Sequence, residues 1–277
     1  MIFPVYFVFL LLSHLLTLLP STSPTPVNTT IWQPRVGTTW QIELPEKLTD
    51  SMLNVEVYDI DLFINHKPTI DTLHAKNRKV ICYFSAGTYE PYRCDHRRFH
   101  EEDMGKNLTN ADWHTERWLN INSPNVRSIM SSRLDLAAYN GCDGVDPDNV
   151  DGYNNDNGLG LTEKDSVEYV LWLAKEASSR GLAIGLKNAG EIISQTIDHM
   201  QWSVNEQCAQ KHECQMFAPF VEQGKPVFHI EYPKGEDVAD ENPVDDEKKK
   251  QACEFENSGL FSTVMKNMKL DKWLQNC

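Results

Sequence analysis

A short acidic run in the middle of the chain carries the residue types most suited to chemistry. Residues 141–153 read Gly-Cys-Asp-Gly-Val-Asp-Pro-Asp-Asn-Val-Asp-Gly-Tyr, with four aspartates close together. If 143–149 forms a strand, its two-residue period puts Asp146 and Asp148 on one face and turns Asn149 away. Two such carboxylates could act as acid and base, as a nucleophile or as metal ligands. The same composition is also typical of a loop that simply turns the chain.

Polar residues also end several other apolar runs that we predict to be strands. The expected strands lie at 39–44, 55–63, 79–86, 143–148, 183–187, 202–206, 226–232 and 260–266. The polar residues toward their C-terminal ends are Asp59, Asp61, Tyr83, Ser85, Asp146, Asp148, Lys187, Asn188, Asn205, Glu206, Glu231 and Tyr232. One polar strand end is ordinary, but so many mostly acidic ends indicate a shared pocket.

Helical patterns between these runs predict the fold class. Residues 125–139 repeat apolar positions at helical spacing, and 162–180 opens with an N-cap-like Thr-Glu-Lys-Asp and ends before Gly181. Alternating strands and helices predict an α/β fold, a single (β/α)8 TIM-type barrel. A doubly wound open sheet is the alternative, but no glycine-rich phosphate loop follows any strand. Residues 87–142 must contain an extra excursion, in which 118–121 could be another strand.

The N-terminus predicts export. Residues 7–19 are an apolar run of signal-peptide length, although no basic residue precedes Arg35. We therefore expect a signal peptide at 1–22, a short lead-in at 23–38 and a catalytic domain at 39–277 of a secreted, extracellular protein. Sequons at Asn28 and Asn107 agree with a glycoprotein.

Seven cysteines also fit an oxidising compartment. Cys208 and Cys214 could close a small loop, and Cys253 and Cys277 could tie down the C-terminus. Cys82 and Cys142 fall early in consecutive predicted strands and could pair, which would leave Cys94 unpaired. Because the count is odd, the sequence leaves the pairing open.

The net charge of −14 limits the classes of partner. An acidic protein is repelled by nucleic acid and by anionic membranes, so neither is expected as a partner of the mature chain. Long-range attraction would favour a neutral or cationic partner, and we expect the chain to act as a monomer.

Four chemistries compete for the predicted pocket. Glycoside hydrolysis needs two carboxylates on either side of the scissile bond, and Tyr83, Trp202 and Tyr232 could stack on sugar rings. A Schiff-base reaction would use Lys187, but neighbouring acids would raise its pKa, which favours a hydrogen-bonding or charge-balancing role. A nucleophilic serine or cysteine is disfavoured because Ser85 lacks the Gly-x-Ser-x-Gly turn and Cys82 lies deep in its strand.

A metal site is also disfavoured. The run beginning at Asp146 resembles the start of a calcium loop, but Val150 and Asp151 stand where the loop needs an oxygen ligand and a glycine. The histidines are scattered with no His-x-x-x-His pair, which argues against catalytic zinc. The sequence therefore predicts no metal.

Four segments together resemble glycoside hydrolase family 114, the endo-α-1,4-polygalactosaminidase family of fungi and bacteria. These segments are Val80–Glu90, Gly141–Tyr153, Gly185–Asn188 and Val204–Cys208. The likeness runs from about Trp40 to the C-terminus. It implies a (β/α)8 barrel, no cofactor, and hydrolysis inside chains of α-1,4-linked galactosamine by an Asp and a Glu with retention at the anomeric carbon.

Carried onto this sequence, the resemblance places the catalytic pair at Asp148, as nucleophile, and Glu206, as acid/base. The substrate-binding candidates are Asp59, Asp61, Tyr83, Asp146, Asn149, Lys187, Glu231 and Tyr232. The expected partner is a cationic or partly acetylated galactosamine polysaccharide, whose ammonium groups an acidic cleft would attract. The alternative is a secreted barrel that binds amino-sugar polymer without cutting it.

Overall fold

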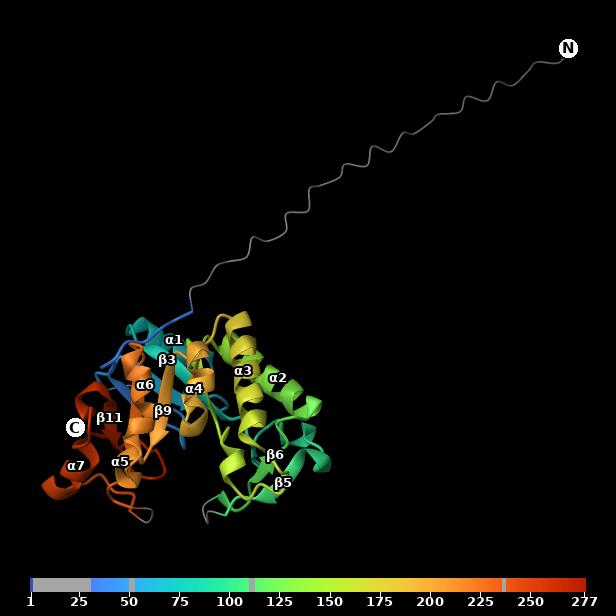
Figure 1. The fold of residues 1–277 in the computed structure, drawn as a ribbon. Coiled ribbons are helices and arrows are strands. Elements are labelled where there is room, and N and C mark those ends of the chain that lie inside the picture. The colour runs from blue at the N-terminus through green and yellow to red at the C-terminus, as the bar shows by residue number, and fades with distance from the viewer. Residues whose placement is uncertain (2–30, 50–52, 110–112, 236–237) are drawn as a thin grey trace.

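A ring of parallel strands forms the centre of the molecule (Figure 1). The computed structural model describes residues 1, 31–49, 53–109, 113–235 and 238–277. Eight parallel strands in these ranges lie side by side in the order β1-β2-β3-β7-β8-β9-β10-β11. Their bounds are β1 Trp40–Glu43, β2 Val57–Asp61, β3 Lys79–Ser85, β7 Gly144–Asp148, β8 Ala183–Lys187, β9 Trp202–Glu206, β10 Val227–Glu231 and β11 Ser262–Met265. All eight strands predicted from the sequence are confirmed.

The last parallel strand lies beside the first. The indole Nε1 of Trp40 on β1 donates to the carbonyl oxygen of Ser262 at 2.7 Å, and the Lys266 ammonium donates to Gln41 Oε1 at 2.9 Å. Beyond β11, a short antiparallel strand, β12 (Gln275–Asn276), extends the sheet. No backbone ladder joins β1 to β11 in the described ranges, so side chains and loops close the ring. The arrangement confirms the single (β/α)8 TIM-type barrel.

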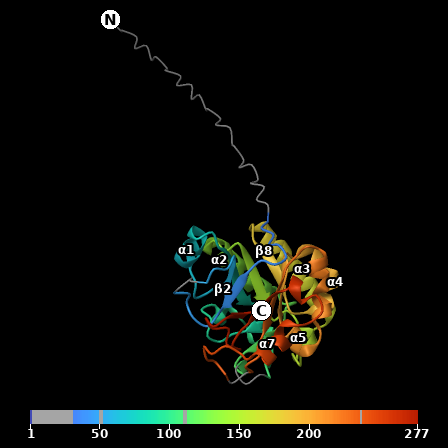
Figure 2. The ribbon, with the colours of Figure 1, turned by 90° about the vertical axis from the view of Figure 1, so that its left-hand side faces the viewer.

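Helices surround the strands (Figure 2). Their bounds are α1 Lys67–Ala75, α2 Pro124–Asn140, α3 Glu163–Ser179, α4 Ile193–Thr196, α5 Cys208–Lys211, α6 Ala218–Glu222 and α7 Asp246–Cys253. The ends of the two long helices follow the expected capping chemistry. Ser123 caps α2, which ends at Gly141 with φ 89°, and Thr162 forms a capping box with Asp165 at the start of α3. Both helices predicted from the sequence are confirmed.

The long segment between β3 and β7 contains the extra excursion. It builds a separate antiparallel sheet in the order β4-β6-β5, from β4 Thr88–Tyr89, β5 Met104–Asn107 and β6 Arg117–Leu119. The expected strand at 118–121 therefore exists at 117–119. It belongs to this small sheet, which lies outside the barrel (Figure 1).

Large apolar side chains fill the N-terminal half of the barrel. Trp40, Trp202 and Phe228 lie in one buried cluster, and the Trp40 and Phe228 rings are 4.9 Å apart. Gly185 on β8 provides the space for Trp202, because a Cβ there would stand 2.0 Å from the indole Nε1. Trp202 is fully buried, so the expectation that it stacks on sugar rings is wrong. The Trp32 ring, in the lead-in before β1, packs against the Trp202 ring, with the two ring centroids 5.5 Å apart.

Three disulfides are present in the described part of the chain. They join Cys82 to Cys142, Cys208 to Cys214 and Cys253 to Cys277, while Cys94 is exposed and outside these pairs. These are the pairings that the sequence suggested without settling.

The described residues leave two of the N-terminal expectations untested. The predicted signal peptide at 1–22 and the sequon at Asn28 lie outside them, whereas Asn107 is exposed at the end of β5. No helix within the described ranges has both the length and the apolar character needed to cross a bilayer.

The contact between Gly185 and Trp202 gives a stability prediction. Gly185→Ala should lower the free energy of unfolding by about 1–3 kcal/mol, because the added methyl group overpacks a rigid backbone against the indole. Chemical denaturation measures this change. Gly259→Ala is the control, since an added Cβ there meets no atom within 4 Å. Equal stability of the two variants would contradict the packing account.

Candidate active site

The side chain of Lys187 connects two carboxylates at the C-terminal end of the barrel. Its Nζ lies 3.1 Å from Asp148 Oδ1 and 2.9 Å from Glu206 Oε2. The three residues end the consecutive strands β7, β8 and β9. Only 2% of the Lys187 side chain is exposed, against 16% for Asp148 and 23% for Glu206. The two carboxylates are thus within reach of solvent, and the ammonium lies buried beneath them.

The backbone turns sharply after each of these three residues. Asn149, Asn188 and Gln207 have φ values of 60°, 49° and 65°, which place them in the left-handed region. Non-glycine residues adopt this conformation infrequently, and Asn is among those that tolerate it best. The turns end the strands and leave Asp148, Lys187 and Glu206 at the rim of the barrel.

Two further donors orient Asp148. The Tyr83 hydroxyl donates to Oδ2 at 2.8 Å, and the backbone N–H of Asn149 donates to Oδ1 at 2.8 Å. The Asn149 side chain points elsewhere, since its Nδ2 donates to Ser85 Oγ at 3.0 Å. Tyr83 therefore lies in the site as expected, whereas the Asn149 side chain supports the loop after β3.

Glu206 is held as a carboxylate. Asn188 Nδ2 donates to Oε2 at 3.0 Å, and the hydroxyl of Tyr232 donates to Oε1. Burial alone would raise the pKa of Glu206, but the Lys187 ammonium and these hydrogen bonds outweigh burial and lower the pKa to about 2. Asn188 was absent from the predicted binding residues, although it stands at a strand end in the sequence.

Asp61 and Glu231 lie at strand ends as expected, but their oxygens are engaged by the protein. Asp61 Oδ2 forms a 2.6 Å ion pair with Arg93, and its Oδ1 accepts from two backbone N–H groups. Glu231 Oε1 accepts from the backbone N–H of Ala209 and contacts His229 Nε2, both at 2.8 Å. These carboxylates hold neighbouring loops in place.

Asp59 and Asp146 lie deeper, with no exposed surface. Burial raises the pKa of Asp146 to about 7, although the Lys187 ammonium opposes this shift. Burial and the neighbouring Asp146 together hold the pKa of Asp59 well above its usual range. Neither side chain can touch a substrate that stays at the rim.

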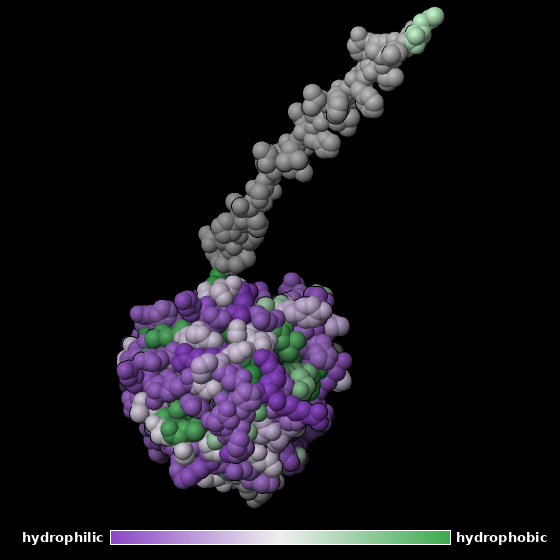
Figure 3. Space-filling view, turned by 90° about the vertical axis from the view of Figure 1, so that its right-hand side faces the viewer, coloured by the Kyte–Doolittle hydropathy of each residue, from purple (hydrophilic) through white to green (hydrophobic). Residues whose placement is uncertain are grey.

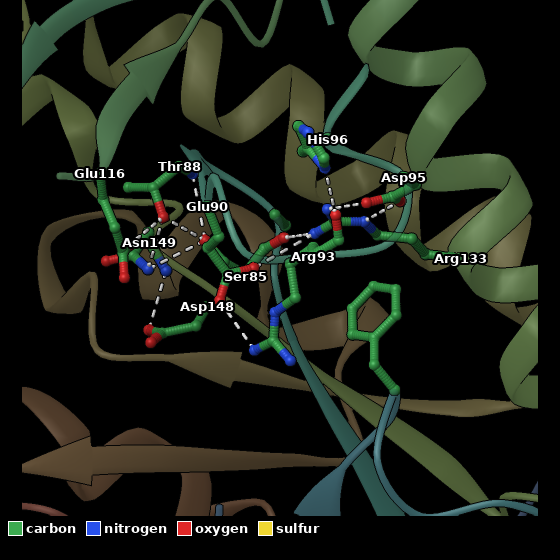
Figure 4. Close-up of polar contacts among 12 residues, drawn as sticks. Ser85, Thr88, Glu90, Arg93, Asp95, His96, Glu116, Arg133, Asp148 and Asn149 are labelled. Carbon is green, nitrogen blue, oxygen red and sulfur yellow. Dashed lines mark hydrogen bonds and ion pairs between the residues drawn. The ribbon is translucent and has the colours of Figure 1, made fainter. Parts of the chain in front are cut away.

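A second polar network, which the sequence did not predict, lies beside Asp148 (Figure 4). Most of its residues come from the excursion. The Arg93 guanidinium forms one ion pair with Glu90 at 2.7 Å and a second with Asp61 of β2 at 2.6 Å. Arg133 of α2 donates to both oxygens of Asp95 and to the carbonyl oxygen of Ser85. Because these contacts cross the excursion, no strand-end pattern in the sequence could reveal them.

Glu116 completes this network on the side of β6. Its Oε2 accepts from Thr88 Oγ1 at 2.9 Å, and its Oε1 accepts from the Tyr92 hydroxyl at 3.0 Å. Burial and the nearby Glu90 carboxylate raise the pKa of Glu116 to about 7. Tyr92 is 63% exposed, so its aromatic side chain is accessible to solvent while its hydroxyl contacts Glu90 and Glu116.

One cluster in the described residues has the spacing of metal ligands. It comprises Cys208, Cys214 and His229. Both sulfurs are joined in a disulfide, so neither offers the thiolate that a metal requires. The carboxylates of the site instead contact the Lys187 ammonium.

Comparison with known proteins identifies the family. The family model for glycoside hydrolase family GH114 matches residues 21–277. The chain belongs to family GH114. The crystal structure of Ega3 from Aspergillus fumigatus in complex with galactosamine is 56% identical, with a TM-score of 0.88, and the match covers 91% of this chain and 100% of the chain in that structure. This GH114 chain is therefore a glycoside hydrolase by family, as the sequence motifs predicted.

More distant structures share the fold. The glycoside hydrolase domain of PelA from Pseudomonas aeruginosa is 12% identical with a TM-score of 0.66, and the match covers 86% of this chain and 98% of that domain. A family 20 β-N-acetylglucosaminidase has a TM-score of 0.55 at 9% identity, over 86% of this chain and 65% of that one. No curated protein sequence matches this GH114 chain.

The position of Lys187 gives a prediction for this GH114 site. Lys187→Met should lower the free energy of unfolding at pH 7 by about 3–5 kcal/mol, because it leaves two carboxylates without their shared counter-charge. The loss should be smaller at pH 5, since without the ammonium the pKa of Glu206 rises and protonation removes the charge. Urea denaturation at both pH values measures this.

Lys164→Met is the matched control. Lys164 is 84% exposed and pairs with Glu168 at 3.7 Å on the surface of α3, so its loss should change stability by less than about 1 kcal/mol. If Lys187→Met is as stable as this control, Lys187 does not hold the two carboxylates together.

Proposed function

We propose that this protein is a secreted, retaining endo-hydrolase that cleaves α-1,4-galactosaminidic bonds within galactosamine-containing polysaccharide. The observation that carries the proposal is the pair Asp148 and Glu206, held on one ammonium at the mouth of a GH114 barrel. The substrate class is supported by the likeness to Ega3, which was crystallised with galactosamine.

The spacing of the two carboxylates supports retention. Both contact the same Nζ, at 3.1 and 2.9 Å, so Asp148 Oδ1 and Glu206 Oε2 lie at most about 6 Å apart, a limit that accommodates the carboxyl separation of about 5–5.5 Å typical of retaining enzymes. In the first step a carboxylate attacks the anomeric carbon while the other carboxyl protonates the departing glycosidic oxygen. Water, deprotonated by the second group, then displaces the enzyme from the anomeric carbon.

We assign Asp148 as the nucleophile and Glu206 as the acid/base. Asp148 accepts from Tyr83, the Asn149 N–H and Lys187, contacts that fix a carboxylate in one orientation. Glu206 is ionised in the protein without substrate, because its pKa is about 2. To act as the acid it must therefore gain a proton when substrate binds, which requires its contact with Lys187 to weaken.

The remaining site residues would position the sugar or the catalytic pair. Tyr83, Lys187 and Tyr232 contact the pair directly. Asp61, Asp146, Asn149 and Glu231 would act through the side chains and loops that they support. Deacetylated galactosamine is cationic, and a protein of net charge −14 would attract it over a distance.

Export as a monomer completes the proposal. Three disulfides in the described residues fit an extracellular protein. The face drawn in Figure 3 is mostly hydrophilic, with small separate apolar patches, which fits a protein that acts alone.

Substitution of the pair tests the proposal. Asp148→Asn and Glu206→Gln should each lower kcat on α-1,4-galactosamine oligomers by about 10³-fold or more while the circular dichroism spectrum stays unchanged. Glu168→Gln, an exposed carboxylate on α3, is the control and should retain activity. Normal cleavage by both site variants would reject the assignment. Binding of oligomers without cleavage by the unaltered protein would support the alternative of a non-catalytic binding barrel.

Azide separates the two roles. In Asp148→Ala, azide should replace the lost nucleophile and give a product of inverted configuration, whereas in Glu206→Ala it should attack the glycosyl-enzyme and give retention. Nuclear magnetic resonance of the glycosyl azides reads the configuration. The reverse pattern would exchange the roles of Asp148 and Glu206.

The charge argument predicts a salt effect. Raising the ionic strength from about 0.05 M to about 0.5 M should lower kcat/KM on a deacetylated oligomer roughly threefold or more, because salt screens attraction between the acidic protein and a cationic chain. A fully acetylated oligomer of equal length is the control, since it carries no ammonium groups. Equal salt dependence of the two substrates would reject long-range attraction.

A further inference from the structure

Two carboxyl groups lie inside the barrel with no counter-charge in contact. Asp59 on β2 and Asp146 on β7 both have 0% of their surface exposed. None of their four carboxyl oxygens has a hydrogen-bond donor among the described residues. The two groups are within hydrogen-bonding distance of each other. Burying two ionised carboxylates here would cost far more free energy than burying one carboxylate that accepts a hydrogen bond from a protonated carboxyl.

The sheet register explains why these two groups meet. Strands β2 and β7 are the two neighbours of β3, with Asp59 opposite Ile81 and Asp146 opposite Tyr83. Asp146 lies two residues before Asp148 on β7, so both side chains point to the same face. The pair therefore forms a layer between the apolar cluster around Ile81 and the catalytic carboxylates above it.

We propose that Asp59 and Asp146 share one proton, and that the single negative charge of this pair positions the Lys187 ammonium between Asp148 and Glu206. The second half of this inference rests on the proposed function of Asp148 and Glu206, whereas the shared proton does not. Asp146 is the better-placed charge, because β7 is the direct neighbour of β8, which carries Lys187. Both aspartates thus act as positioning residues, not as substrate contacts.

The charges around the pair determine its response to pH. Asp146 faces Lys187, Asp148 and Glu206, and Asp59 faces Asp146, Lys187 and Asp148. Burial raises the pKa of Asp146 to about 7 and, together with Asp146, holds the pKa of Asp59 well above its usual range, so above neutral pH Asp146 is ionised while Asp59 keeps the shared proton. When the pH rises far enough to ionise Asp59 as well, a second buried negative charge appears and attracts Lys187 away from the proposed catalytic carboxylates. Activity should therefore fall on the alkaline side.

Infrared spectroscopy tests the shared proton directly. At alkaline pH, above the pKa of Asp146, the unaltered protein should show the C=O stretch of a buried protonated carboxyl, and this band should disappear only when the pH rises further and Asp59 ionises. Asp59→Asn and Asp146→Asn should each remove it. Glu116→Gln is the matched control, because it removes a different buried carboxyl that is ionised above its pKa of about 7, and so should leave this band in place. A band unaffected by either aspartate variant would overturn the shared proton, whether or not the protein is a hydrolase.

The pH profile of kcat/KM on galactosamine oligomers tests the positioning role. In Asp59→Asn the amide can donate to the Asp146 carboxylate at any pH, so the alkaline limb should move upward by about one pH unit or more. In Asp146→Asn the charge would lie on β2, and kcat should fall about tenfold further than in Asp59→Asn while KM changes little. An alkaline limb at the same pH in Asp59→Asn and the unaltered protein would overturn the role of the pair in positioning Lys187. Thermal unfolding of each variant verifies that it is folded.

Discussion

The buried ammonium of Lys187 is the charge around which the site is built. Removing a cation from water costs several kcal/mol, and carboxylates at hydrogen-bonding distance offset that cost. Asp148 and Glu206 supply two of them, from the strands on either side of Lys187. The same attraction that allows Lys187 to be buried therefore fixes the separation of the two carboxylates, and with it the stereochemistry that we propose for the reaction.

The backbone of the barrel makes this arrangement possible. Consecutive parallel strands bring their C-terminal ends to one edge, and a left-handed residue after each of β7, β8 and β9 stops the strand where its side chain reaches the rim. Below the rim, Gly185 accommodates Trp202, which fills the barrel where a polar interior would be unstable. The functional layer is thus polar at the top and supported by close apolar packing beneath.

A second set of contacts joins this layer to the excursion between β3 and β7. Arg93 bridges Asp61 on β2 to Glu90. Arg133 on α2 donates to the end of β3 at Ser85 (Figure 4). Both guanidinium groups are almost fully buried and paired, so the excursion is held firmly against the rim. The exposed Tyr92 belongs to this part of the molecule, and its hydroxyl donates to Glu90 and Glu116.

The sequence by itself determined the strands, the two long helices, the barrel and the residues at its rim. Apolar periodicity and capping residues act locally, so Thr162 and Gly141 could be assigned to helix ends without any knowledge of their neighbours. The motifs around Asp148 and Glu206 also indicated the GH114 family. Tyr83, Lys187 and Tyr232, which the sequence placed at strand ends, contact Asp148 or Glu206 because parallel strand ends converge.

Only the tertiary structure decided which rim residues remain available and which are used internally. Asp61 and Asp148 look alike in the sequence, yet Asp61 is engaged by Arg93, a residue of the excursion whose position no strand pattern predicts. In the sequence Trp202 suggests a surface for stacking a sugar, but the strand register places it in the core, opposite Gly185. Burial, counter-charge and hydrogen bonding depend on residues distant in the chain, and these determine whether a carboxyl group stays within reach of solvent, as Asp148 does, or is held by the protein, as Asp61 is.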